Sequence, residues 1–230
     1  MLFMGAGANA QESANDDLNS CVKKEQVLTT AKGAGLGALA GLSAMLVSHK
    51  SEDAGKAALI GAVAGGVAGF ATAYYTAIDT CYKKNPSWIP ESKLQRTKDY
   101  DKVKKEIHYN PKQGFVTKVR SIDVPAVVAA GSQADVTSNF IVMTPQGDDA
   151  PVTIERKLFV VEGDKQTEVP FPTQNATQQL TLEPGEQQDT VHVPIPPDAK
   201  PGSKFIYQVS VASSSGGKPD VQQKPLVVSQ

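Results

Sequence analysis

Hydrophobic and polar positions divide the chain into two regions with different periodicities. From Phe115 onward, apolar residues alternate with polar ones, as at Val191, Val193 and Ile195. Period-two alternation is typical of strands with one buried face. Turn-forming segments such as AAGSQ, TPQGDDAP, EPGEQ and PPDAKPGSK separate the alternating stretches. About seven or eight short strands predict that residues 113–230 form an all-β immunoglobulin-like sandwich, although the Cys…Trp…Cys signature of true immunoglobulins is absent.

The region before residue 82 instead has small residues at every fourth position, in two apolar runs. The glycines of these runs are Gly33, Gly37 and Gly41, followed by Gly61, Gly65 and Gly69. Glycine inside a helix costs roughly 1 kcal/mol relative to alanine. Such spacing is useful where absent side chains let two helices approach closely. The two runs therefore predict a packed pair of helices with these six glycines at the contact.

The positions of the glycines and cysteines predict an antiparallel hairpin. Gly33 with Gly69, Gly37 with Gly65, Gly41 with Gly61 and Cys21 with Cys81 are all centred on residue 51, inside the polar segment SHKSEDAGK. We predict helices over 22–48 and 53–82, within a hairpin spanning 21–82 that a Cys21–Cys81 disulfide closes. Such a bridge stabilises by about 4 kcal/mol. The alternative is two free thiols with accidental spacing.

The hairpin has the composition of a membrane-inserted segment. Residues 57–77 carry no charge, and about twenty such residues can cross a bilayer. We expect Tyr74, Tyr75, Tyr82 and Trp88 to lie at an interface. Two further glycines, Gly35 and Gly66, lie off the predicted seam and are expected to contact other copies in a homo-oligomer. Packing of the hairpin on protein is the alternative.

The N-terminal residues indicate export. Ala8-Asn9-Ala10 has the small-x-small pattern of a signal-peptidase site, so 1–10 is interpreted as the remnant of a signal peptide and 11–20 as a polar segment that starts at Gln11. LNSC at 18–21 resembles the end of a lipobox, which leaves lipidation of Cys21 as an alternative. Two cysteines in an exported chain are most simply explained by a disulfide.

The runs GAGLGALAGLSA and GKAALIGAVAGGVAGFATA resemble the glycine-zipper two-transmembrane family of bacterial envelope proteins, which includes SlyB-type outer-membrane lipoproteins and a rickettsial surface antigen. The resemblance covers roughly residues 27–78. It implies an envelope protein whose hairpins associate in a membrane. It implies nothing about residues 113–230.

A basic segment at 83–112 is predicted to connect the two regions. Residues 82–112 have a net charge of +5, and Pro90-Glu91 is a suitable helix start. The end of the segment also permits a β-hairpin turning at 110–114. Beside a membrane, basic and aromatic residues can contact lipid headgroups. The predicted contacts are Lys83, Lys84, Trp88, Lys93 and Arg96. A solvated linker helix is the alternative.

No sequence motif indicates catalysis or cofactor binding. His49, His108 and His192 are scattered over three segments without metal-ligand spacing, and no Gly-x-Ser-x-Gly or Gly-Lys-Ser/Thr motif occurs. The formal charge of −1 argues against a nucleic-acid-binding protein with a basic surface. We therefore expect no enzyme activity, no cofactor and no metal.

Together these patterns predict an α+β multidomain protein: a glycine-zipper hairpin followed by a β-sandwich. The predicted function is non-enzymatic. The hairpin anchors and self-associates in the cell envelope, in the outer membrane, while the sandwich is displayed on the periplasmic or external side to bind an envelope protein. The alternatives are a pore-forming or secreted membrane-inserting protein, and a subunit of a secretion machine or surface filament with its hairpin buried against partners.

Overall fold

The computed structural model describes residues 16–28, 51–171, 176–214 and 216–229, and it gives side-chain surroundings in the long helix from Val67 onward. The chain divides into two compact units, Met1–Ile89 and Pro90–Gln230. We describe each unit by itself.

The first unit contains a helix over residues 16–28, the long helix α3 (Ser51–Lys84) and the short 3-10 helix η1 (Pro86–Trp88). α3 ends where Asn85 caps η1, because the Asn85 side chain accepts a hydrogen bond from the Ser87 amide and Pro86 cannot continue an α-helical ladder. The predicted second helix is confirmed. Residues 29–50, most of the predicted first helix, lie outside the described residues. No helix among the described residues is long and apolar enough to cross a membrane.

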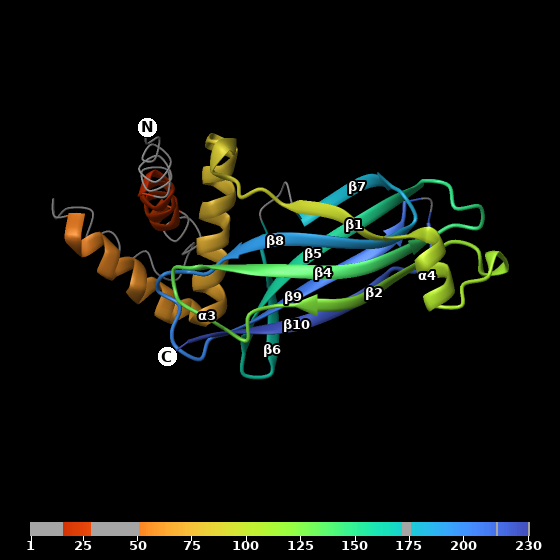
Figure 1. Cartoon of the computed structure of the whole chain (residues 1–230). Coiled ribbons are helices and arrows are strands. Elements are labelled where there is room, and N and C mark those ends of the chain that lie inside the picture. The colour runs from red at the N-terminus through yellow and green to blue at the C-terminus, as the bar shows by residue number, and fades with distance from the viewer. Residues whose placement is uncertain (1–15, 29–50, 172–175, 215, 230) are drawn as a thin grey trace, which may run out of the picture. The chain divides into compact units, whose positions relative to one another are not determined.

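The second unit is a sandwich of two mainly antiparallel sheets (Figure 1). One sheet has the order β1-β8-β4-β2, with bounds Lys93–Asp99, Gly185–Pro194, Gln133–Met143 and Val116–Asp123. The other has the order β3-β10-β9-β5-β6, with bounds Val127–Val128, Asp220–Val228, Lys204–Ser213, Ala150–Glu162 and Lys165–Val169. β7 (Thr177–Leu182) also pairs with β5. The predicted immunoglobulin-like sandwich is confirmed.

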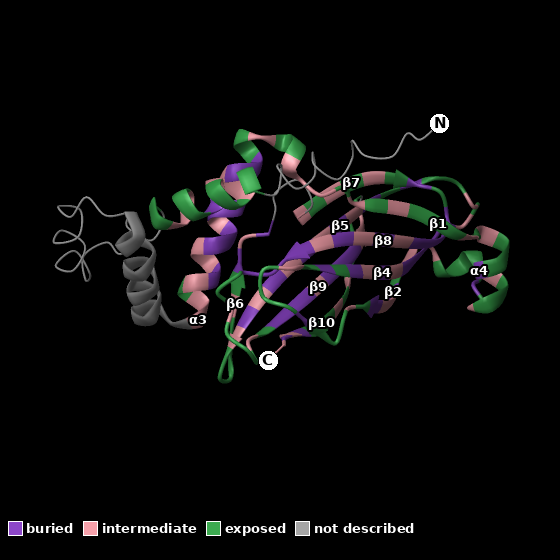
Figure 2. Cartoon of the chain, turned by 60° about the vertical axis from the view of Figure 1, so that its left-hand side comes forward, coloured by how far each residue is buried: buried purple, intermediate pink, exposed green. Residues whose placement is uncertain are grey.

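The core lies between the two sheets and follows the period-two pattern. Inward residues such as Val136, Phe140, Val191 and Val209 have at most 1% of their surface exposed, while their neighbours along each strand are more exposed. Figure 2 shows this alternation as buried and partly exposed bands along β4, β8 and β9. The alternation therefore identified core strands such as β4, β8 and β9.

The basic segment predicted at 83–112 is not a separate connector. β1 pairs with β8 from Lys93↔Thr190 to Asp99↔Gly185, so the sandwich takes in residues well before 113. The helix expected from Pro90 is limited to α4 (Tyr100–Glu106), which Asp99 caps by accepting a hydrogen bond from the Lys102 amide. The hairpin alternative at 110–114 does not form, because the preceding residues are helical and Pro111–Gln113 is the 3-10 helix η2. β1 was missed because its residues are mostly charged and lack apolar alternation.

α4 covers one end of the outer face of the four-stranded sheet. Val103 and Tyr109 pack with Ile141 and Met143 in a small buried cluster, with Tyr100 and Ile107 partly buried at its edge. Ile141 and Met143 are therefore buried although they point away from the main core. This packing attaches the end of the predicted connector firmly to the sandwich.

Candidate interaction site

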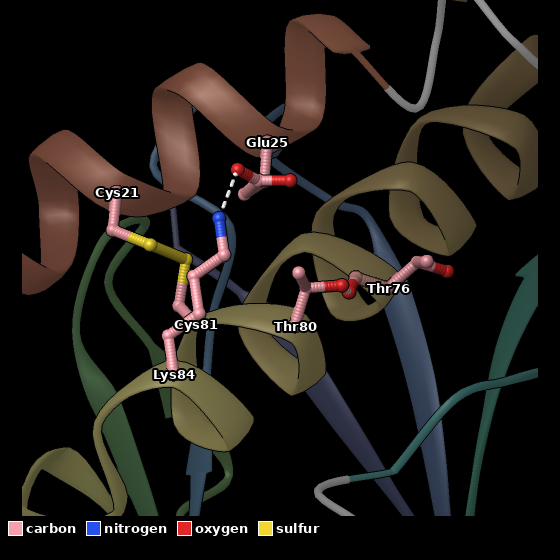
Figure 3. Close-up of a disulfide and its surroundings, with 6 residues drawn as sticks. All are labelled: Cys21, Glu25, Thr76, Thr80, Cys81 and Lys84. Atoms are coloured by element: carbon pink, nitrogen blue, oxygen red, sulfur yellow. Dashed lines mark hydrogen bonds and ion pairs between the residues drawn. A yellow bond between two sulfur atoms is a disulfide. The ribbon is translucent and has the colours of Figure 1, made fainter.

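The disulfide joins the helix over 16–28 to the last turns of α3 (Figure 3). Cys21 and Cys81 are bonded, with their Cα atoms 6.1 Å apart, and this confirms the predicted pairing. Lys84 Nζ lies 2.6 Å from Glu25 Oε1, so an ion pair joins the same two helices beside the disulfide. A disulfide of this kind indicates an extracytoplasmic location, because reducing conditions prevail in the cytosol.

The tyrosines around the disulfide are buried. Tyr75 and Tyr82 have 1% and 3% of their surface exposed, and Tyr74 makes an edge-to-face contact with Tyr75, with ring centroids 5.2 Å apart. Burial raises the pKa of Tyr82 to about 12, so its hydroxyl stays protonated. The interfacial position expected for these three tyrosines is therefore not what the structure shows, because protein surrounds their rings.

The predicted glycine seam falls largely outside the described side chains. Gly33, Gly35, Gly37 and Gly41 lie outside the described residues. For Gly61, Gly65 and Gly66 only the helical backbone is described. Gly69 is exposed, and a Cβ atom built on it would meet no heavy atom within 4 Å among the described residues. The facing of the glycines, and contact between copies through Gly35 and Gly66, stay predictions.

The predicted headgroup contacts are divided between the two units. Lys83, Lys84 and Trp88 belong to the first unit, whereas Lys93 and Arg96 lie on β1 in the second. Three of the cations have acidic partners: Lys83 Nζ is 2.6 Å from Asp79, Lys84 pairs with Glu25, and Arg96 Nη1 is 2.7 Å from Glu183. Lipid contact at these positions would compete with those ion pairs.

The outer face of the four-stranded sheet carries a line of hydrogen-bonded polar side chains. Asn139 on β4 donates to Ser121 (3.0 Å) and Asp123 (3.2 Å) on β2. Gln188 on β8 donates to Asn139 at 3.3 Å, and Gln95 on β1 donates to Gln188 at 2.9 Å. The line therefore crosses all four strands. Gln95 and Gln188 each use one of their two amide hydrogens in this line, so this face can offer further hydrogen bonds to a polar partner.

Four charged side chains form a closed ring where α4 meets this sheet. Lys98 lies 3.1 Å from both Glu106 and Glu186, and Arg120 lies 2.6 Å from Glu106 and 3.2 Å from Glu186. Each cation contacts both carboxylates. Hydrogen bonds from Arg120 and Lys98 lower the pKa of Glu106, and those to Glu106 and Glu186 raise the pKa of Lys98. The ring thus joins α4 to β1, β2 and β8.

We expect Glu106→Gln to lower the free energy of unfolding at neutral pH and to have little effect in acid. The folded-state pKa of Glu106 lies below its ordinary value of 4.5. The ionised carboxylate therefore stabilises the fold above that ordinary value, and this contribution is lost as the pH falls through the folded-state pKa. Urea denaturation of wild type and variant at several pH values tests this, with exposed Glu91→Gln as the control. A constant difference between wild type and E106Q at all pH values would contradict the ring.

A second ion pair lies inside the sandwich. Arg156 of β5 donates from Nε and Nη2 to the two carboxylate oxygens of Asp189 on β8, both at 2.8 Å, and from Nη2 to Gln178 on β7 at 2.9 Å. Arg156 and Asp189 are each 1% exposed. Burial raises the pKa of nearby Tyr207. The pair joins the two sheets through the core.

Sequence reasoning missed both ion-pair groups, although the buried one left a signal. Arg156 stands between Ile154 and Leu158 in the period-two pattern, and Asp189 stands two positions before Val191. A charge at an inward position of a strand requires a partner. The ring of Lys98, Glu106, Arg120 and Glu186 left no comparable signal.

The described residues show little that is suited to catalysis. They contain no group of three or more His, Cys, Asp or Glu side chains that could hold a metal ion. His192 Nδ1 lies 2.6 Å from Asp135 Oδ1 on the outer face of the four-stranded sheet. A histidine–carboxylate pair can orient a general base, but catalysis also needs a nucleophile or substrate site next to it.

No family model and no curated protein matches this sequence. Solved structures resemble about half of the chain. A sporulation control protein from Bacillus subtilis is 12% identical, with 50% of this chain and 49% of that chain covered and a TM-score of 0.33. A CARDB domain from Pyrococcus furiosus is 14% identical, with 50% of this chain and 94% of that chain covered and a TM-score of 0.34. A Niemann-Pick type C2 protein from the Japanese carpenter ant is 15% identical, with 49% of this chain and 92% of that chain covered and a TM-score of 0.35.

These similarities concern β-sandwich domains, and no function is transferred from them. The match spans about half the length of the Bacillus protein. The resemblance of residues 27–78 to the glycine-zipper family finds no support among family models. What the structure itself shows is a disulfide-linked helical unit joined to a sandwich with a polar outer face.

Proposed function

We propose that this protein is an exported, non-enzymatic component of the bacterial envelope. Its disulfide-closed hairpin anchors the chain and associates with other copies in a membrane, and its sandwich is displayed for contact with an envelope protein. The observation that carries the proposal is the Cys21–Cys81 bridge, which joins the helix over 16–28 to the end of α3. The glycine-rich residues between them would then form one closed loop with two antiparallel arms, as the centred glycine pairs predict.

The disulfide end of the hairpin is the part expected outside the lipid. Buried Tyr74, Tyr75 and Tyr82 and the Lys84–Glu25 ion pair lie there. A charged pair inside hydrocarbon is costly, whereas in an aqueous compartment it is readily tolerated. The membrane part would therefore be the glycine-rich end, toward the polar segment centred on residue 51.

A second candidate function is a subunit of a secretion machine or surface filament. The burial of Tyr74, Tyr75 and Tyr82 favours this function, because the C-terminal part of α3 then packs on protein. In such an assembly, the glycine-rich runs would face partner helices instead of lipid.

Envelope fractionation of the producing cells separates these functions. The anchor predicts a protein that sediments with membranes, resists carbonate extraction and needs detergent for release. The assembly subunit predicts release without detergent as part of a large lipid-free complex. A soluble form that makes liposomes leak would instead favour a pore-forming protein and would contradict the anchor.

Two glycine variants test how the hairpin associates. We expect Gly37→Leu to separate the two arms, since four added heavy atoms would occupy the place of the partner backbone, and overpacking costs about 1 to 3 kcal/mol. Gly66→Leu should leave the arms together and weaken association between copies. Disulfide yield, thermal stability and oligomer mass in mild detergent are the measurements. Equal behaviour of the two variants would argue against facing glycines.

A further inference from the structure

We propose that β7 is a pairing edge through which two copies of this chain join their six-stranded sheets, with the two β7 strands antiparallel. β7 pairs with β5 over six positions, from Glu155↔Thr177 to Ala150↔Leu182. Within the described residues, β5 is the one strand to which β7 is paired. This surface is on the sandwich and is independent of the proposed membrane anchor.

The other edges of the sandwich carry features that oppose strand addition. β1 has a bulge between Arg96 and Lys98 and is rich in basic residues, and β3 is two residues long. β6 carries Lys165 and Glu168 in five residues. Charges, bulges and short length are the usual protections of an edge strand.

The edge of β2 is closed by side chains from the opposite sheet. Asp220 Oδ2 accepts a hydrogen bond from the Val119 amide at 2.6 Å, and Gln222 Nε2 donates to the Val119 carbonyl at 2.6 Å. At Val119, two side chains of β10 thus take the place of a neighbouring strand. β2 also has a bulge between Val119 and Ser121.

β7 has neither the charges nor the bulges that protect the other edges. Its sequence, TQQLTL, contains no charge, proline or glycine, and its register with β5 runs without a bulge. Threonine and leucine are compatible with strands. An uncharged six-residue strand whose outer edge pairs with no other described strand is prone to pairing.

The position of Pro151 identifies which β7 groups point outward. Pro151 lies opposite Thr181 and has no amide hydrogen, and its carbonyl accepts a hydrogen bond from Ser214 on the other side of β5. Pro151 and Thr181 are therefore a non-hydrogen-bonded pair, and the pattern alternates along the strands. The amides and carbonyls of Thr177, Gln179 and Thr181 consequently point away from β5 and are available to an added strand.

A second copy is the partner that fits this edge. In a two-fold arrangement each residue meets its own counterpart or a near neighbour, so any charge on the strand would face the same charge. β7 carries none. Registers that place Gln179 or Leu180 opposite itself keep the exposed residues of both strands on one face. Because the other edges are protected, such a pairing closes as a dimer and does not extend into a fibre.

Variants at Gln179 test the proposal in the full chain. Gln179→Pro removes an outward amide hydrogen without removing a bond to β5, and Gln179→Lys places like charges near one another in either register. Gln179→Ala keeps the amide and is the matched control. We expect wild type and Q179A to dimerise, and Q179P to dimerise at least tenfold more weakly. Q179K should weaken dimerisation at low salt and recover at high salt. Unchanged circular dichroism and melting temperature verify folding.

Hydrogen exchange distinguishes this edge from association through the hairpin. Mass spectrometry at several protein concentrations should show that protection of the peptide covering 177–182 rises with concentration in wild type and Q179A, and not in Q179P. The peptide covering 116–123 should be insensitive to concentration, because the edge of β2 is already closed. Fast exchange in β7 at every concentration, or concentration-independent protection that Q179P leaves unchanged, would overturn the proposal.

Discussion

Asp189→Leu is expected to lower the free energy of unfolding of the sandwich by about 3 to 5 kcal/mol, because it leaves the Arg156 guanidinium buried without its carboxylate. Two charge-assisted hydrogen bonds of 2.8 Å are lost, and the neutral amide of Gln178 cannot neutralise the charge. Arg156→Met should cost a similar amount, since it leaves Asp189 as the buried unpaired charge. Chemical denaturation followed by far-ultraviolet circular dichroism measures both losses.

The double variant Arg156→Met with Asp189→Leu is the control for these single changes. Replacing a buried ion pair by apolar residues of similar size is often neutral or stabilising, because the cost of desolvating both charges disappears. We therefore expect the double variant to be more stable than either single variant. Losses that simply add, or a single variant that costs less than about 1 kcal/mol, would show that the pair does not act as a unit.

Gly185→Ala is expected to cost roughly 3 kcal/mol or more and to release β1 from the sheet. Gly185 has a φ of 140°, which other residues rarely adopt, and it pairs with Asp99 of β1. A Cβ atom there would collide with the Lys98 carbonyl oxygen. Since that oxygen belongs to the backbone, the strand itself must move. Faster hydrogen exchange in the peptide covering 93–99, together with the unfolding free energy, measures the effect.

Gly163→Ala is the matched control for Gly185→Ala. Gly163 also has a positive φ, 60°, but an added Cβ atom would meet nothing within 4 Å. This substitution should cost only the backbone strain, about 1 kcal/mol, without affecting exchange in β1. If the two variants have equal effects, the close approach of β8 to β1 is not what requires glycine at position 185.

The sequence by itself determined the features that depend on local periodicity. Alternation along residues such as 136–142, 191–195 and 205–211 predicted the sandwich, because a strand that buries one face must repeat every two residues. The cysteine pair has the same midpoint, residue 51, as the three glycine pairs. This shared midpoint predicted the disulfide, since two antiparallel helices bring residues at equal distances from their turn together. The charge-free composition of 57–77 suggested a membrane segment, but no helix among the described residues is long and apolar enough to cross a membrane.

Only the tertiary structure decided the features that depend on neighbours distant in sequence. β1 is recognisable as a strand only from its pairing with β8, because its charged residues form the edge of a sheet and need no apolar alternation. The ring of Lys98, Glu106, Arg120 and Glu186 combines four elements that no spacing relates. The closed edge of β2 and the open edge of β7 likewise follow from which strands are neighbours. Local sequence fixes the period of an element, whereas its partners are fixed by the folding of the whole chain.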